Sequence, residues 1–197
     1  MNAREHTDVE VATNEDEQRV VDTITLAFCA DPIIRWFFPT PHAYQQYFPE
    51  LVRAYGGKAF EHESAYYAGE FAAASLWLPP GVDPDDDALV ELFLNALPEK
   101  RQPHALEAAE ELERYHPTEP FWHLPFIGAE PYKQRKGYGS ALMKYATDVC
   151  DREGTVAYLE STNAENISLY VRHGFEILGT VRIGSMPPLF PMVRRPE

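Results

Sequence analysis

The sequence predicts an α/β (α+β) fold in which helices flank a central mixed sheet of six to seven, mostly antiparallel, strands. Three observations carry this prediction. Short apolar runs separated by turn residues indicate antiparallel neighbours in the first half and at the chain end. A strand–helix–strand unit over residues 121–161 indicates one parallel pair, because such strands are joined by a right-handed crossover. A length of 197 residues with 45% hydrophobic content suits one domain, residues 1–197.

The first 81 residues are predicted to hold a strand, two helices and a β-hairpin. In chain order, these elements are a strand at 8–13, a helix that stops before 30–32, a helix over 44–55, and hairpin strands at 64–69 and 71–78. Asn14 and Glu17 have the spacing of a capping box for the first helix. Gly56 and Gly57 end the second helix, and the hairpin turns near Gly69.

Residues 82–116 differ in character, because they include ten acidic residues and three Lys or Arg residues. Two helices are predicted, at about 85–97 and 103–115, and we interpret the segment as an acidic helical insert that covers one side of the sheet. The run Asp83–Asp87 offers oxygen ligands but lacks the spacing and the glycine of a calcium loop. It is typical of a solvated helix N-terminus, where acidic side chains complement the helix dipole.

The second half has clearer boundaries. Its predicted elements are a strand at 121–130, a helix from 140 to 153, a strand at 156–161, a short helix after 162–165, and closing strands at 175–183 and 189–195. Gly154 and Gly174 are natural stops for the two helices. Thr162 and Glu165 have capping-box spacing, and the final strand is expected to be exposed, where it offers a dimer contact.

The balance of charge limits the possible partners. The chain has 31 acidic and 17 basic residues, for a net charge of −14. This argues against non-specific nucleic-acid binding, which needs a basic surface. The negative field favours cationic partners such as amines, or it serves solubility alone.

Membrane, metal and disulfide signals are weak in this sequence. No apolar run approaches the roughly 18 residues of a membrane helix, and the polar N-terminus lacks the apolar core of a signal peptide, so we expect a cytoplasmic protein. Cys29 and Cys150 are too few for a disulfide framework and are expected to be reduced. No metal is expected, since no HExxH spacing occurs among the histidines; surface positions are expected for His42, His104, His116 and His173.

A glycine-rich loop lies between a predicted strand and a predicted helix, where helix N–H groups form a ready anion site. Its sequence, "QRKGYG" over residues 134–139, does not match the GxxxxGK[ST] loop of nucleotide hydrolases. The dinucleotide fingerprint GxGxxG also fails, because Leu142 stands where the third glycine is required. The pattern [QR]xxGxG is matched completely.

That pattern resembles the acetyl-CoA pyrophosphate loop of the GCN5-related N-acetyltransferase (GNAT) family. The segments "IGAEP", "YLES", "NISLYVRHGF" and "PMVRRP" resemble the family's fourth strand, its fifth strand, the element that follows and the usual chain end. "AFCADPIIRWFFP" and "AASLWLPPG" look like the branch related to puromycin N-acetyltransferase. The resemblance covers nearly the whole chain except residues 82–116, and it implies the GNAT fold.

The resemblance implies acetyl-CoA as the cosubstrate. The loop N–H groups would wrap the pyrophosphate, and the pantetheine arm would lie between the splayed fourth and fifth strands, paired with the backbone of Ile127 and Ala129. Pro125 has no N–H group and is expected at an edge or a bulge. The implied cofactor-binding residues are Ile127, Gly128, Ala129, Gln134, Arg135, Lys136, Gly137, Tyr138, Gly139, Ser140, Asn163, Asn166 and Tyr170. For Asn163 and Asn166, a helix-capping role is the alternative.

Tyr170 matches the tyrosine that protonates the leaving thiolate in the family. Its ordinary pKa, about 10, lies above that of a thiol, about 8.5, so the hydroxyl keeps its proton and is able to donate it. The alternative is a packing role, because Gly174 as a left-handed helix stop brings Phe175 against Tyr170. Both roles are compatible.

A carboxylate near the end of the fifth strand is the favoured base. Glu160 ends that strand and would act through water. Glu130, beside the loop, and His123, on the fourth strand, are alternatives. A proton leaving through water without a dedicated base is a further alternative.

The acceptor is expected at the first two helices and their junction. Aromatic walls with one carboxylate suit a small amine that carries an apolar or planar body. The predicted substrate-binding residues are Asp31, Arg35, Trp36 and Tyr44. The alternative is that Trp36 and the rings beside it belong to the core.

Together these patterns predict an N-acetyltransferase that moves an acetyl group from acetyl-CoA to a primary amine of a small molecule, by direct attack in a ternary complex. One alternative is acetylation of a protein N-terminus or lysine. Another is a non-catalytic acyl-CoA sensor, which would keep the loop without needing Tyr170. A monomer and a homodimer are both compatible with the sequence.

Overall fold

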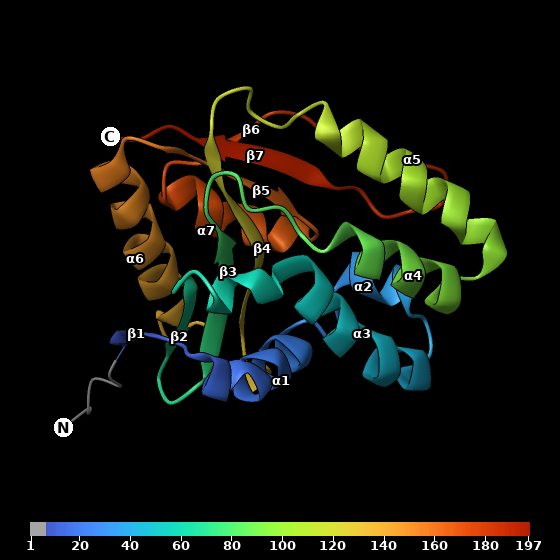
Figure 1. Ribbon diagram of the computed structural model, residues 1–197, viewed down its shortest axis with the longest axis horizontal. Coiled ribbons are helices and arrows are strands. Elements are labelled where there is room, and N and C mark those ends of the chain that lie inside the picture. The colour runs from blue at the N-terminus through green and yellow to red at the C-terminus, as the bar shows by residue number, and fades with distance from the viewer. Residues whose placement is uncertain (1–6) are drawn as a thin grey trace.

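The computed structural model describes residues 7–197, which form a seven-stranded mixed sheet with helices on both faces (Figure 1). The strand order is β1-β2-β3-β4-β5-β7-β6, and only β4 and β5 run parallel. The strands are β1 (Val9–Val11), β2 (Ala65–Ala68), β3 (Ala73–Leu78), β4 (Phe121–Ala129), β5 (Val156–Ser161), β6 (Glu176–Ile177) and β7 (Phe190–Arg194). The predicted mixed, mostly antiparallel sheet is confirmed. Residues 1–6, on which the expected lack of a signal peptide partly depends, lie outside the described residues.

Seven α-helices and five short 3₁₀ turns connect the strands in residues 7–197. The helices are α1 (Glu17–Ala27), α2 (Pro32–Phe37), α3 (Pro41–Gly56), α4 (Asp86–Ala96), α5 (Gln102–Glu113), α6 (Tyr138–Glu153) and α7 (Ile167–Arg172). The 3₁₀ turns are Asn14–Asp16, Gly57–Phe60, Glu99–Arg101, Pro131–Lys133 and Ala164–Asn166. No helix among them is long and apolar enough to cross a membrane.

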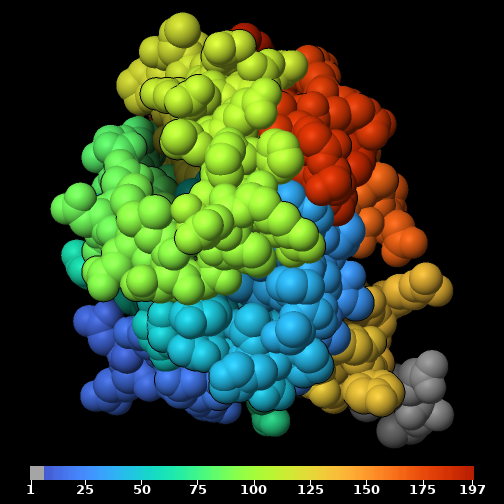
Figure 2. All heavy atoms as spheres, turned by 90° about the vertical axis from the view of Figure 1, so that its right-hand side faces the viewer, coloured from blue at the N-terminus to red at the C-terminus, as the bar shows by residue number. Residues whose placement is uncertain are grey.

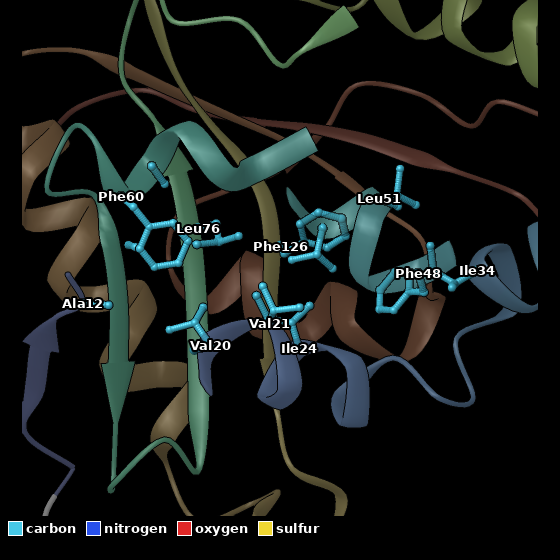
Figure 3. Packing of buried hydrophobic residues seen from close by; sticks show 14 of the residues in the cluster. Ala12, Val20, Val21, Ile24, Ile34, Phe48, Leu51, Phe60, Leu76 and Phe126 are labelled. Atoms are coloured by element: carbon cyan, nitrogen blue, oxygen red, sulfur yellow. The ribbon is translucent and has the colours of Figure 1, made fainter. Parts of the chain in front are cut away.

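Two hydrophobic clusters cover the two faces of the sheet. On one face, Val21 and Ile24 of α1 and Phe48 of α3 pack against Leu76 of β3 and Phe126 of β4 (Figure 3). On the other face, apolar residues of α6 and α7 pack against β3, β4 and β5. Each fully buried large apolar side chain stabilises the fold by about 1.5–3 kcal/mol. Together the clusters hold β4 and β5 between two helical layers.

The first helix is capped one residue earlier than the sequence predicts. Thr13 is the capping residue, and its N–H group donates to the Asp16 carboxylate over 3.0 Å. The 3₁₀ turn that precedes α1 places Asp16, rather than Glu17, three residues after the cap. The predicted Asn14–Glu17 capping box is therefore wrong, although the helix it announces is present.

The acidic insert forms its two predicted helices but lies over other helices rather than directly on the sheet. α4 packs on α3, while Ala108 of α5 packs with Ile33, Trp36 and Met186. Because α1 and α3 already cover this face of the sheet, the insert adds an outer layer (Figure 1). From the side, α4 and α5 form the middle of the surface, above α2 and α3 (Figure 2).

The end of the chain departs from the prediction of two long closing strands. β6 has only two residues; beyond it, a hydrogen bond from Leu178 to Pro191 and a bridge between Val181 and Leu189 remain, and the chain then passes beside α5. Gly184, for example, is so close to the His104 ring that an added Cβ atom would lie 2.7 Å from it. β7 lies between β5 and β6 in the sheet, so the expectation of an exposed final strand is wrong.

A bidentate ion pair fixes the end of β7 to α6. The Arg194 guanidinium donates to both oxygens of Asp151 over 2.7 and 2.8 Å, and its Nε donates to the His173 carbonyl. The hydrogen bonds from Arg194 lower the pKa of Asp151 below its ordinary value of 3.8. Because the Arg194 side chain is only 5% exposed, removing its partner would leave a buried cation.

We therefore expect Asp151→Asn to lower the free energy of unfolding by about 2–4 kcal/mol near neutral pH. A carboxylate whose pKa is lowered in the folded state stabilises the fold above its unfolded pKa, and this contribution disappears as the pH falls through the folded pKa. The difference in free energy of unfolding between the wild type and Asp151→Asn should thus be largest above about pH 5 and should shrink below about pH 4. Urea unfolding across this range measures it, with Asp148→Asn as the control, because Asp148 forms an exposed pair with Lys144. A pH-independent difference would contradict the assignment.

Candidate active site

The parallel strands β4 and β5 separate partway along their length. Their ladder pairs Phe121 with Val156 and ends where His123 pairs with Tyr158, although both strands continue. Between its pairs with Leu76 and Leu78 of β3, β4 contains one extra residue. This bulge includes Pro125, as the sequence predicts, and it lets the remainder of β4 diverge from β5.

Beyond this point, the β5-facing edge of β4 is not paired with β5. Ile127, Gly128 and Ala129 pair with β3 through their other edge only. Close packing against α1 also requires glycine at position 128, because an added Cβ atom would lie 2.5 Å from the Cβ atom of Ala27. The geometry fits an extended ligand whose amides imitate a strand in the gap.

The glycine loop lies at the end of β4 and opens α6. Arg135 (φ 61°) and Gly137 (φ 95°) are both left-handed, a geometry in which backbone N–H groups form anion-binding concavities. Among the described residues, no side chain caps α6 at Gly137. A Cβ atom added to Gly137 would have one neighbour within 4 Å among the described residues, Thr7 at 3.9 Å. A Cβ atom added to Gly139 would likewise have one, Leu169 at 3.5 Å. The space beside both glycines is therefore open, and a pyrophosphate could approach the backbone there.

Side chains of the loop have different surroundings. The Gln134 amide donates to the Ala129 carbonyl over 3.4 Å, which joins the loop to β4. The Tyr138 ring is buried and packs against Gly69, so its side chain belongs to the core. The Ser140 hydroxyl lies 2.8 Å from Nε2 of His173, whereas Arg135 and Lys136 are exposed at the rim.

Tyr170 lies on α7, beneath the glycine stop of that helix. Its carbonyl accepts from the N–H groups of His173 and Phe175, and Gly174 is left-handed (φ 83°). The rings of Tyr170 and Phe175 are in edge contact at 6.3 Å, as the packing alternative requires. Burial, and then the charge of Asp31, raise the pKa of Tyr170, so the phenol keeps its proton.

Glu160 lies two residues beyond the last residue of β5 that pairs with β4, and it contacts two histidines. Its Oε2 lies 3.0 Å from Nε2 of His123, and its Oε1 lies 3.5 Å from Nε2 of His116. Burial alone raises the pKa of Glu160, but the charge of His123 and the hydrogen bonds of both imidazoles lower it to about 2. The carboxylate is therefore ionised at all working pH values.

A carboxylate with so low a pKa is a weak proton acceptor, and its ordinary effect is to hold and stabilise the imidazoles. His123, one of the alternatives for the base, is joined directly to Glu160, whereas Glu130 has no such contact within residues 7–197. His116 is exposed, as the sequence predicts, but it also approaches Glu160, a contact that no spacing in the sequence indicates. Within residues 7–197, no group of three His, Cys, Asp or Glu residues is arranged to hold a metal ion.

Asp31 links α2 to the end of β5. Its Oδ1 accepts from the N–H groups of Ile33 and Ile34, both over 3.0 Å, as a helix cap. Its Oδ2 accepts from the Thr162 hydroxyl over 2.6 Å. Burial raises the pKa of this carboxyl group. Of the four predicted substrate-binding residues, Asp31 is the one joined to the β5 end.

The other three residues are held within the helical layer. The Arg35 guanidinium donates to the Pro39 carbonyl and lies 5.2 Å from the Tyr44 ring, whose hydroxyl donates to the Thr25 carbonyl. Trp36 is buried in a smaller hydrophobic cluster with Ile33 of α2 and Ala108 of α5. The core alternative therefore describes the Trp36 ring.

The two asparagines of the predicted site also differ. Asn163 accepts from the N–H group of Glu165 over 3.0 Å and so caps the 3₁₀ turn before α7. The predicted Thr162–Glu165 capping box is wrong, because the Thr162 hydroxyl is bonded to Asp31 instead. Asn166 precedes α7, and its side chain does not cap that helix.

A separate pocket lies between α3 and α4 and shares no residue with the predicted site. Its lining consists of Tyr47, Glu50, Ala54, Ala88, Glu91, Leu92 and Asn95. The chemistry described above lies instead where β4 and β5 separate, so we place the candidate active site there.

Comparison with known proteins agrees with this geometry. The model of the acetyltransferase (GNAT) family matches residues 33–175. An uncharacterized N-acetyltransferase of Schizosaccharomyces pombe is 26% identical over 210 residues, which cover 93% of this chain and 81% of the relative.

Solved structures share the fold over nearly the whole chain. A Corynebacterium glutamicum protein, described as a histone acetyltransferase HPA2 and related acetyltransferase, is 26% identical with a TM-score of 0.68 over 96% of both chains. Arylalkylamine N-acetyltransferase 2 of Aedes aegypti is 12% identical with a TM-score of 0.68, over 96% of this chain and 99% of that one. The Drosophila melanogaster polyamine N-acetyltransferase is 14% identical with a TM-score of 0.68, over 95% and 99%. The chain therefore belongs to the acetyltransferase (GNAT) family and is an acetyl-CoA-dependent N-acetyltransferase.

Proposed function

We propose that the protein transfers the acetyl group of acetyl-CoA to the primary amine of a small molecule, by direct attack in a ternary complex. The observation that carries the proposal is the separation of β4 from β5 at His123 and Tyr158, with Glu160 at the opening. The unpaired edge of β4, the contacts of Glu160 with His123 and His116, and the glycine loop at the end of β4 support this proposal together.

The donor side of the site is assigned to β4 and the loop. The backbone of Ile127, Gly128 and Ala129 would pair with the pantetheine amides and supply an N–H group to the thioester oxygen as charge builds on it. The N–H groups of residues 135–140 would hold the pyrophosphate at the start of α6. Gln134 positions the loop against β4, and Asn163 and Asn166 remain candidate contacts near α7.

On the acceptor side, the amine must lose a proton and the sulfur must gain one. His123, stabilised by Glu160, accepts the proton of the attacking amine directly or through water. Tyr170, kept protonated by burial, donates to the leaving thiolate. The two groups thus perform opposite tasks, one accepting a proton and the other donating one.

A small amine is the favoured acceptor because aromatic rings enclose the proton-accepting cluster. Tyr55 lies 5.5 Å from the His123 ring in edge contact, and Tyr158 and Phe121 lie 4.9 and 5.5 Å from the His116 ring. Such walls suit an amine with a planar body, and the resemblance of the first half to the puromycin acetyltransferase branch points the same way. Asp31, the cap of α2 that accepts from Thr162 just after β5, is the candidate for a second polar contact, with Arg35, Trp36 and Tyr44 shaping the helical layer behind it.

The proposal is tested by measuring CoA release from acetyl-CoA with a panel of arylalkylamines, polyamines and aminonucleosides, beside histone-tail and alanine-ended peptides. We expect kcat/KM for the best small amine to exceed that for any peptide by at least about a hundredfold. Preference for a peptide would favour the protein acetyltransferase, whereas tight acetyl-CoA binding without turnover of any acceptor would favour the sensor.

A further inference from the structure

The acidic insert contributes one side chain to the cluster around Glu160. His116, which follows α5, approaches Oε1 of Glu160 to 3.5 Å, while His123 of β4 occupies Oε2 at 3.0 Å. The two imidazole rings are 6.3 Å apart. One carboxylate, with a single negative charge, therefore serves two imidazoles.

The two histidines differ in their access to solvent. The side chains of Glu160 and His123 are 9% and 10% exposed, whereas that of His116 is 37% exposed. A charge on His116 is thus partly hydrated, while a charge on His123 depends on Glu160 for its stabilisation. The two imidazoles therefore share one carboxylate from differently hydrated positions.

The other groups that face the pair do not compete for protons near neutral pH. Tyr55 of α3, which is half-buried, and Tyr158 of β5, which is buried, lie beside Glu160, and burial followed by the charge of Glu160 raises the pKa of both phenols. Asp86 of α4 acts on Tyr55, and Tyr115 acts on Tyr158. In the described part of the cluster, the imidazoles are the groups whose ordinary pKa lies near neutrality.

We propose that His116 is a positioning residue that sets the proton affinity of His123 through their shared Glu160 carboxylate. In the reaction, an N–H bond of the amine breaks and an N–H bond forms on the His123 imidazole, while Glu160 remains ionised. A proton on His116, or its hydrogen bond to Oε1, withdraws part of the negative charge that stabilises protonated His123. The insert thereby keeps His123 unprotonated, and able to accept a proton, at lower pH.

This inference rests on the proposed function for its role in the reaction, but the coupling itself can be measured without an acceptor. We would follow the ring ¹⁵N and ¹³C signals of His123 by NMR during pH titration of the wild type and of His116→Asn. The expected result is a rise of the His123 midpoint by about half to one pH unit in the variant, because a neighbouring cationic site is removed. For an amine that the enzyme acetylates, the acidic limb of the pH profile of kcat/KM should move by the same number of pH units.

His104→Asn is the matched control, since His104 also lies on the insert but contacts Trp36, at a ring separation of 6.5 Å. It should leave the His123 midpoint within about 0.2 pH unit of the wild type. A His123 midpoint that does not rise in His116→Asn would overturn the inference, even if amines are acetylated. If the His123 midpoint rises in His116→Asn but no amine is acetylated by the wild type, the coupling is supported and the proposed function is contradicted.

The wild type gives a second, independent measurement if His116→Asn does not fold. Coupled histidines titrate with curves that depart from a single-site shape, with each curve inflecting near the midpoint of the other. Such biphasic curves for His116 and His123 are expected, and two independent single-site curves would contradict the proposal.

Discussion

Replacing Tyr170 by Phe is expected to lower kcat by at least about a hundredfold while acetyl-CoA affinity stays within about twofold, which is the effect of removing a general acid. The substitution deletes the hydroxyl and keeps the ring that packs against Phe175. Because burial and Asp31 raise the pKa of Tyr170, the wild-type phenol remains protonated through the basic range used in assays. A basic limb in the pH profile of kcat would therefore belong to another group.

The matched control is Tyr66→Phe, because Tyr66 is buried in the same hydrophobic cluster but lies on β2 and contacts Tyr145 of α6. It loses a buried hydroxyl in the same way and should keep near wild-type kcat. Steady-state kinetics and calorimetric binding of acetyl-CoA separate the two effects. If kcat for Tyr170→Phe equals that of the control, Tyr170 is a packing residue only.

The order of elements was predictable from the sequence because local signals set most boundaries. Gly154 and Gly174, both left-handed, end α6 and the turn after α7 at the predicted positions. Pro125 marked the bulge of β4 because a residue without an N–H group cannot continue the ladder. The glycine loop was also identifiable, since its pattern excluded two other phosphate-binding motifs.

The interior of the site was less predictable because it depends on contacts between distant segments. Nothing near His116 or Glu160 in the sequence indicates that the insert reaches β5. Asp31 was predicted from its position beside aromatic residues, but the bond of its Oδ2 to Thr162 is a contact that only the packed fold creates. The two predicted capping boxes failed because other bonds form at these turns: the Thr13 N–H donates to Asp16, and Asn163 accepts from the Glu165 N–H while the Thr162 hydroxyl is bonded to Asp31.

The loop assignment predicts that Gly139→Glu weakens acetyl-CoA binding by at least about a hundredfold. Gly139 lies in the first turn of α6 with helical backbone angles, so the new side chain introduces no backbone strain. Its carboxylate would instead enter the region where the uncapped helix end and two left-handed residues favour an anion, and it would repel the pyrophosphate. Isothermal titration calorimetry measures the change directly.

Gly139→Ala separates this electrostatic effect from the loss of glycine. An added methyl group would lie 3.5 Å from Leu169, which is an ordinary contact, and alanine favours the helix by up to about 1 kcal/mol. We expect this variant to bind acetyl-CoA within a few-fold of the wild type and to unfold at an equal or higher temperature. Equal binding by Gly139→Glu and Gly139→Ala would exclude the loop as the pyrophosphate site, because a carboxylate and a polyphosphate do not share a small concave surface without a measurable cost. If only the glutamate variant loses binding and both remain folded, the positive charge and left-handed backbone gathered in this acidic chain have a single explanation, the docking of a polyanionic cosubstrate.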